Sequence, residues 1–145
     1  MEIEESLRNR VEALLDARQK TLGDSLGITF TKLTRDEVVA TMPVDHRTVQ
    51  PVRILHGGAS VALAESVMSV GALLQLSPDS NQTVVGLEIH ANHIRSVPEG
   101  GQVTATARPR HRGRRTQVWE TELQDNEGNT ICLSRLTLMN VDLPV

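Results

Sequence analysis

The stretch LHGGASVALAESVMSVGALLQL, residues 55–76, is the most apolar part of the chain and decides its fold. Glu65 carries its only formal charge, and polar residues interrupt any apolar run of about 18 residues that could span a membrane. Many of the other residues are Gly, Ala or Ser, which would let a β-sheet approach closely. A helix that is apolar on nearly every face is a buried one. The stretch therefore predicts a long central helix enclosed by other elements, with Glu65 buried.

The segments on either side of this helix are predicted to be strands. Residues 27–33 and 37–44 are short β-prone runs with a polar break between them, which is typical of a hairpin. Four further runs, rich in Val, Ile and Thr and separated by turn residues, cover residues 82–96, 102–112, 115–125 and 130–141. We therefore predict an α+β domain. An antiparallel sheet of about six strands, the last four as a meander, wraps around a central helix placed between the second and third strands.

The N-terminal segment, residues 1–24, is predicted to add one helix to the same domain as residues 25–145. Apolar residues recur at helical spacing from Ile3 to Leu22, and Gly23 is a typical helix stop. The acidic start lacks the basic and apolar regions of a signal peptide. Cys132, the only cysteine, cannot form an intrachain disulfide and is expected to be a small buried residue. These features favour a cytoplasmic protein.

Composition argues against several kinds of ligand. The 145 residues include 15 Lys and Arg against 18 Asp and Glu, a net charge of -3, so no general attraction to nucleic acid or anionic membranes is expected. Trp119 and Phe30 are the only aromatic residues, which leaves few platforms for stacking bases. Only His90 and His93 form a close histidine pair, and no second pair completes a tetrahedral metal site. We expect no metal and no cofactor.

Glu65 requires an explanation in such an apolar helix, because burying an unpaired carboxylate is costly. The helix could have one wet edge, an arginine could pair with the carboxylate, or the carboxylate could have a chemical task. Ser69 lies one turn further along on the same side of the helix. A hydroxyl beside a carboxylate can hold a water or orient a substrate, which favours the chemical task.

The start of the helix, His56-Gly57-Gly58, offers main-chain N–H groups that have no partner within the helix. Together with the helix dipole they can stabilise the oxyanion that develops on a carbonyl under attack. Gly57 and Glu65 are about 12 Å apart along one helix, so both cannot reach one small carbonyl. A symmetric dimer would resolve this, because the helix start of one protomer could face Glu65 of the other.

These segments are similar to those of a known family. Residues 50–51 (QP), 55–60 (LHGGAS) and 63–66 (LAES) resemble the hotdog-fold acyl-CoA thioesterases, as do residues 84–96 and 115–119. More narrowly, they resemble the branch that contains the 1,4-dihydroxy-2-naphthoyl-CoA and Arthrobacter-type 4-hydroxybenzoyl-CoA thioesterases. The resemblance extends over residues 27–140. It implies a homodimer with active sites at its interface, often paired into a dimer of dimers.

The resemblance also implies a role for individual residues toward an acyl-CoA substrate. Glu65 would act as the nucleophile or as a general base for water, and the Gly57 N–H would polarise the thioester carbonyl. His56 and Gln50 would position the carbonyl and sulfur, and Ser69 would assist the carboxylate. The related phenylacetyl-CoA thioesterases tend to have Asp where this chain has Glu65, so the resemblance favours the aryl-CoA and naphthoyl-CoA side of the family. It implies an aromatic or other bulky acyl group, as in menaquinone biosynthesis or aromatic catabolism.

The contacts with coenzyme A are implied at the later segments: Gly86, His93, Arg95, Gly113, Arg114 and Arg115. Further arginines crowd the same predicted hairpin, at positions 108, 110 and 112, and guanidinium groups match phosphate oxygens. A solvated turn is the alternative reading of such a charge run. Arg53 stands where the family pattern leads us to expect a small or apolar residue, so the acyl preference is left open.

Two other functions fit the same segments. A non-catalytic acyl-CoA-binding hotdog domain would use the fold without chemistry, although such a domain does not need the costly carboxylate. A hotdog enoyl-CoA hydratase or dehydratase would pair an acid with a catalytic histidine, for which His56 is the candidate.

Overall fold

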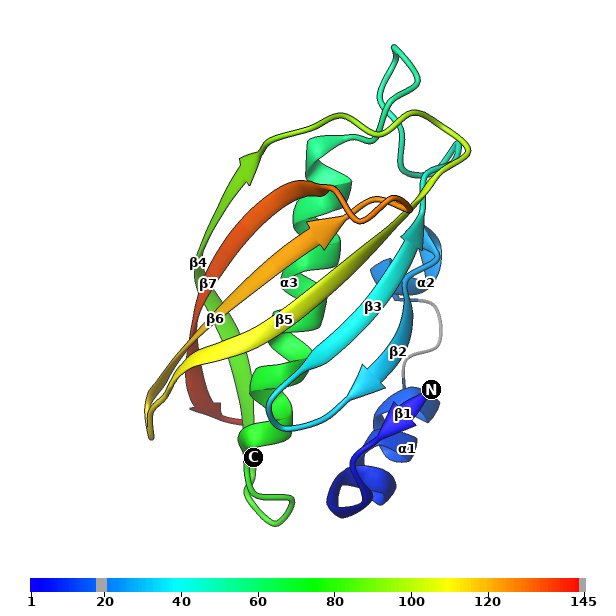
Figure 1. Ribbon diagram of the computed structural model, residues 1–145. Helices are drawn as coiled ribbons and strands as arrows, with labels where there is room; N and C mark the ends of the chain where they lie inside the picture. Colours follow the sequence, from blue (N-terminus) through cyan, green and yellow to red (C-terminus); the bar gives the residue numbers. More distant parts are fainter. Residues whose placement is uncertain (18–20, 144–145) are drawn as a thin grey trace.

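The computed structural model describes residues 1–17 and 21–143, and of residues 15–17 the main chain alone. Figure 1 shows a curved sheet wrapped around one long helix, which confirms the predicted α+β architecture and the central position of the helix. In chain order the elements are β1 (Glu2–Ile3), a 3-10 helix η1 (Glu5–Leu7), α1 (Arg8–Ala17), α2 (Leu22–Leu26), β2 (Thr29–Leu33), β3 (Val38–Pro43), α3 (Gly57–Gln75), β4 (Gln82–His93), β5 (Gln102–Arg112), β6 (Thr116–Gln124) and β7 (Thr130–Asp142).

The sheet has seven strands in the order β1-β2-β3-β5-β6-β7-β4, and all pairs except β1 with β2 are antiparallel. The strand beyond the predicted six is β1, which has two residues. The predicted meander of the last four strands is wrong for β4, which pairs with β7 at the far edge instead of with β5. The connection after β4 is held at the start of α3, where Leu55 N donates to Val97 O at 2.8 Å. This anchoring separates β4 from β5.

Small side chains bring α3 and the sheet close together. Ala64 and Ala72 of the helix and Ala105 and Ala107 of β5 are fully buried in this contact. The ring of Trp119 packs so closely on Gly71 that a Cβ there would lie 2.6 Å from it. The close approach predicted from the small residues is therefore confirmed. Within the described residues, no helix is both long and apolar enough to cross a membrane.

One face of α3 is not covered by the sheet. Val61, Glu65, Ser69 and Leu73 follow one another at intervals of four residues, and none of them is buried. The Glu65 side chain is exposed, so the prediction of a buried carboxylate is wrong for the single chain. The cause is that the sheet curls around one side of the helix and ends at β4. The apolar pattern alone does not reveal this open face.

The single N-terminal helix predicted for residues 3–22 is also wrong. Ile3 belongs to β1, and residues 18–20, inside the predicted helix, lie outside the described residues. A new helix, α2, begins after Thr21, whose side chain forms a capping box with Asp24. Gly23 lies within α2, and the helix ends instead at Gly27, which has a φ of +74°. The capping residues Thr21 and Gly27 therefore decide where α2 begins and ends, although the apolar spacing alone indicates one longer helix.

The end of α3 is held by arginines from two other segments. Arg35, in the turn between β2 and β3, donates to Leu74 O at 3.1 Å. Arg10 of α1 donates to Leu76 O, and burial lowers the pKa of its guanidinium. Helix C-termini leave carbonyl groups without partners and carry a partial negative charge, so both contacts are favourable. The N-terminal region thus helps to cap the central helix.

We expect Arg10→Ala to lower the free energy of unfolding by about 1.5 kcal/mol, because it removes a charged donor from a helix end. Arg8→Ala is the matched control, since Arg8 is exposed and forms an exposed ion pair with Glu5, so its loss should change stability little. Urea denaturation of both variants measures the difference. Equal stability of the two variants would contradict the capping role.

Candidate active site

The start of α3 presents one main-chain N–H group without an acceptor. Gly58 N donates to the Nδ1 of His56 at 2.8 Å, and Ala59 N donates to His56 O at 2.9 Å. Within the described residues, the N–H of Gly57 has no acceptor. It is therefore available to a ligand at the positive end of the helix dipole. This is the same N–H that the sequence predicts as the carbonyl polariser.

His56 and Gln50 add side-chain donors near this end of the helix. Because the Nδ1 of His56 accepts a hydrogen bond, a neutral ring carries its proton on Nε2. The Oε1 of Gln50 accepts from Val52 N at 3.2 Å. Its amide nitrogen has no acceptor in the part of the chain that the structure describes. The two side chains predicted to position the thioester thus each have an N–H donor to offer.

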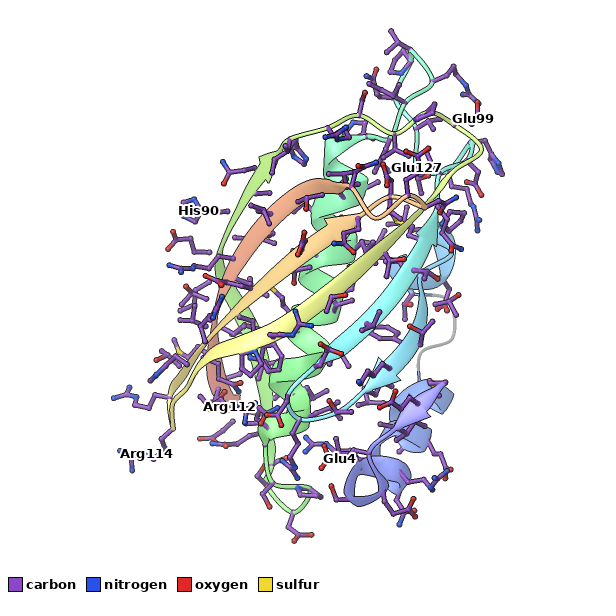
Figure 2. The ribbon with its side chains drawn as sticks, in the orientation of Figure 1. Glu4, His90, Glu99, Arg112, Arg114 and Glu127 are labelled. Atoms are coloured by element: carbon purple, nitrogen blue, oxygen red, sulfur yellow. The ribbon has the colours of Figure 1, made fainter. Side chains whose placement is uncertain are left out.

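Arg53 lies in the turn between Gln50 and the helix start and has a φ of +62°, which is unusual for a residue with a side chain. Its Nε donates to the Oε2 of Glu99 at 2.8 Å, and Glu99 N donates to Arg53 O at 3.0 Å. Glu99 lies at this end of the molecule in Figure 2. Arg53 therefore ties the loop before α3 to the connection after β4, which gives this departure from the family pattern a structural reason.

Strand β4 runs alongside α3 and contacts both halves of the candidate site. A Cβ on Gly57 would lie 3.0 Å from the Nε2 of His93, so the imidazole sits directly beside the helix start. A Cβ on Gly86 would lie 3.2 Å from the Oε1 of Glu65. A β-bulge follows Gly86, as is common beside active sites. The sequence predicts His93 and Gly86 as coenzyme A contacts. The structure places His93 beside Gly57 and Gly86 beside the Glu65 carboxylate.

The two serines near Glu65 differ in what their hydroxyls do. The Oγ of Ser66 donates to Ala62 O of the same helix at 2.7 Å. The half-buried Ser69, one turn beyond Glu65, has no hydrogen-bond partner within the described residues. Ser69 is therefore the hydroxyl that is available beside the carboxylate.

Within one chain, Gly57 and Glu65 are too far apart to contact the same small carbonyl group. Gly57 and Glu65 lie in the same unbroken helix, about 12 Å apart along its axis. A hollow of about 410 Å³ does open on the outer face of the sheet, where it is lined by Arg108, Arg110 and Glu120 among others. None of the predicted site residues lines this hollow. Within one chain, Gly57 and Glu65 therefore lie at two separate places along α3.

The arginines of the β5–β6 hairpin divide into two groups. Three of them pair with acids of the same chain: Arg108 with Glu37, Arg110 with Glu120, and Arg112 with Asp36. Arg114 and Arg115, at the tip, have no acidic partner among the described residues, and Figure 2 shows Arg114 at this tip. Arg95, also predicted as a coenzyme A contact, lies exposed just past the end of β4. The free cationic groups of the hairpin are therefore at its turn.

Comparison with known proteins places the chain in a family. The family model of the Thioesterase superfamily matches residues 53–132. A 1,4-dihydroxy-2-naphthoyl-CoA hydrolase of Escherichia coli strain K12 is 48% identical over 127 residues, which cover 88% of this chain and 91% of that protein. The proofreading thioesterase EntH of Cronobacter turicensis is 46% identical over 127 residues, covering 88% and 90%. The crystal structure of a thioesterase from Haemophilus influenzae superposes with a TM-score of 0.85 at 45% identity and covers 92% of each chain.

The chain belongs to the thioesterase superfamily, and its sheet wrapped around a central helix is the hotdog fold. It is an enzyme of the thioester hydrolase class.

We expect Gly86→Ala to reduce turnover by on the order of tenfold while the protein stays folded. The new Cβ would meet the Glu65 carboxylate at 3.2 Å and displace it, and small displacements of a reacting group are costly. Thr83→Ala, in the same strand and away from Glu65, serves as the control. Steady-state hydrolysis of a thioester by the two variants is the measurement. A wild-type rate in Gly86→Ala would show that this contact does not matter.

Proposed function

We propose that the protein hydrolyses an acyl-CoA thioester with an aromatic or other bulky acyl group to the free acid and coenzyme A. The observation that carries the proposal is the unpaired Gly57 N–H at the start of the helix that also carries the exposed Glu65. The 48% identity to a protein named 1,4-dihydroxy-2-naphthoyl-CoA hydrolase supports the choice of acyl group.

In this proposal Glu65 either attacks the thioester carbon or takes a proton from the water that attacks it. Both routes place negative charge on the carbonyl oxygen, and a positioned N–H donor stabilises that charge in the transition state. The Gly57 N–H is this donor, while Gln50 and the Nε2–H of His56 orient the carbonyl and the sulfur. Ser69 holds the carboxylate or its water.

In the general-base route the C–S bond then breaks, the sulfur takes up the proton that Glu65 removed from the water, and the water oxygen stays on the acyl carbon of the free acid. In the nucleophilic route the C–S bond breaks to leave an anhydride between the acyl group and Glu65, and coenzyme A takes a proton from solvent. A water then cleaves the anhydride, which releases the free acid and restores the carboxylate.

The proposal requires a dimer, and β4 is the surface that supports one. This strand forms an edge of the sheet, and Val85, Leu87 and Ile94 on and just after it are 41%, 54% and 55% exposed. Unpaired edge strands are rarely left open in soluble proteins. If β4 pairs with its symmetric copy, the two α3 helices lie antiparallel with their open faces together. Gly57 of one protomer then faces Glu65 of the other.

The same dimer arrangement would bring the β5–β6 turn of one protomer close to the start of α3 in the other, although the two lie far apart within one chain. Figure 2 shows Arg114 at the end of the molecule opposite Glu99, whereas the helix start lies on the Glu99 side. One chain therefore cannot bring the helix start and the turn to one coenzyme A. Two antiparallel helices place the turn of one protomer at the end where the other helix begins, near His93 and Arg95 of that protomer. That two such dimers pair into a tetramer, as the family resemblance implies, stays a prediction.

We expect Glu65→Gln to lower turnover of a naphthoyl- or benzoyl-CoA thioester at least 1,000-fold, on the order of the loss for a nucleophile or general base. Binding of coenzyme A should persist. Ser66→Ala is the control, because the Ser66 hydroxyl is bonded to its own helix. Release of free thiol is the measurement, and undiminished turnover in Glu65→Gln would overturn the mechanism.

Thiol release and an assay of enoyl-CoA hydration together separate the alternative functions. Saturable binding by the wild-type protein without thiol release from naphthoyl, benzoyl, phenylacetyl or fatty acyl thioesters would indicate a binding domain. Hydration of an enoyl-CoA would indicate a hydratase.

Two inactive variants should complement each other if the site is shared between protomers. Gly57→Pro removes the N–H and suits the first position of a helix. Its Cβ also lies 3.0 Å from the Nε2 of His93, so the imidazole has to shift by a few tenths of an ångström. In a 1:1 coproduction with Glu65→Gln, half of the dimers are mixed, and each mixed dimer contains one intact site. We therefore expect about a quarter of the wild-type rate. No recovery in mixed dimers isolated with two affinity tags would contradict a shared site.

A further inference from the structure

A buried amide connects α3 to the arginine-bearing turn. Gln117 of β6 is 1% exposed, and its Nε2 donates both to Ala72 O of α3 and to the Oδ1 of Asn140, each at 3.0 Å. Its Oε1 accepts from the Nε1 of Trp119 at 3.1 Å. Every polar hydrogen of the amide is therefore used, which fixes its orientation. Gln117 thus links α3 to Asn140 by hydrogen bonds, so the position of Asn140 depends on that of α3.

Asn140 in turn binds every carbonyl group of the turn at residues 113–115. Its Nδ2 donates to Gly113 O at 3.3 Å and to Arg114 O at 2.9 Å, and its main-chain N donates to Arg115 O at 2.8 Å. The turn is closed by Gly113 N, which donates to Thr116 O at 2.9 Å. The three carbonyl oxygens of the turn therefore all accept hydrogen bonds from Asn140, two from its side chain and one from its main chain.

The main-chain donors of Arg114 and Arg115, unlike the carbonyl groups of the turn, have no partner within the described residues. Within the described residues, the main-chain N–H groups of Arg114 and Arg115 have no acceptor, and their guanidinium groups have no acidic partner. Successive free N–H groups beside cationic side chains form a suitable place for a phosphate. The carbonyl oxygens that would repel an anion are occupied by Asn140.

We propose that Gln117 and Asn140 are positioning residues that shape this turn to bind a phosphate group of coenzyme A. The inference rests on the proposed function and adds to it two residues that do not touch the substrate. A turn held in its binding shape before the ligand arrives loses less conformational freedom on binding. The connection runs from Ala72, in the helix that carries Glu65, through both amides to the turn. It therefore sets the position of the turn relative to the carboxylate of the same protomer.

The test compares two thioesters of the same acyl group, one with coenzyme A and one with pantetheine, which lacks the nucleotide and its phosphates. Asn140→Ala should raise KM for the coenzyme A thioester about tenfold and leave kcat unchanged. It should leave both constants for the pantetheine thioester at their wild-type values. Asn140→Ser, which keeps one donor, should give an intermediate KM.

Asn129→Ala is the matched control, because Asn129 also holds a hairpin turn by its side chain, but between β6 and β7. It should leave KM for both thioesters unchanged. An equal loss with both thioesters in Asn140→Ala would overturn the inference, since damage to the fold or to the catalytic groups affects both. An unchanged KM for the coenzyme A thioester would overturn it as well.

Calorimetric titration with coenzyme A separates this inference from the proposed function. If wild-type protein hydrolyses neither thioester, the proposed function fails, while the titration still tests the turn. A Kd about tenfold higher in Asn140→Ala than in wild type supports the positioning role. An equal Kd, or no binding of coenzyme A by the wild type, overturns it.

Discussion

Close contact between α3 and the concave face of the sheet sets the geometry of the whole molecule. Alanines on both surfaces and Gly71 beneath Trp119 bring the helix within contact distance along its length. Larger side chains at these positions would push the sheet outward and move β4 away from the helix. The position of His93 beside Gly57, and of Gly86 beside Glu65, therefore depends on small side chains elsewhere in the core.

In the proposed mechanism, the same packing leaves each chain with two incomplete half-sites. A helix that lies inside a curved sheet has one side covered and one side open, and Glu65 lies on the open side. The Gly57 donor and the carboxylate are on one rigid element, so their separation cannot change when a substrate binds. A second copy of the chain is the simplest way to bring a donor and a carboxylate together. Exposure of Glu65 in the single chain is consistent with this requirement, because a carboxylate that meets its partners only in an assembly remains solvated beforehand.

Several features could be predicted because they depend on neighbouring residues alone. The apolar run predicts a central helix, the alternating segments predict strands, and the sequence around Gly57 predicts a helix start with free N–H groups. Features that depend on distant segments were predicted less well. The strand at Ile3 exists because β2 is available to pair with it, and β4 lies at the far edge because its connection is anchored near Leu55. Gln117 and Asn140 are not among the predicted site residues, although a glutamine at an inward-facing strand position next to Trp119 is a signal that a partner is needed.

The sequence by itself determined the fold class and the start of the central helix, and it singled out Glu65 as the one charged residue of that helix, since these follow from composition, spacing and capping chemistry within short segments. The tertiary structure alone decided that Glu65 is exposed, that three of the hairpin arginines are neutralised by acids, and that Arg114 and Arg115 are not. The physical reason is that burial and charge pairing are set by contacts between residues far apart in the chain. A local pattern shows which side chain is present, but only the packed structure shows what it faces.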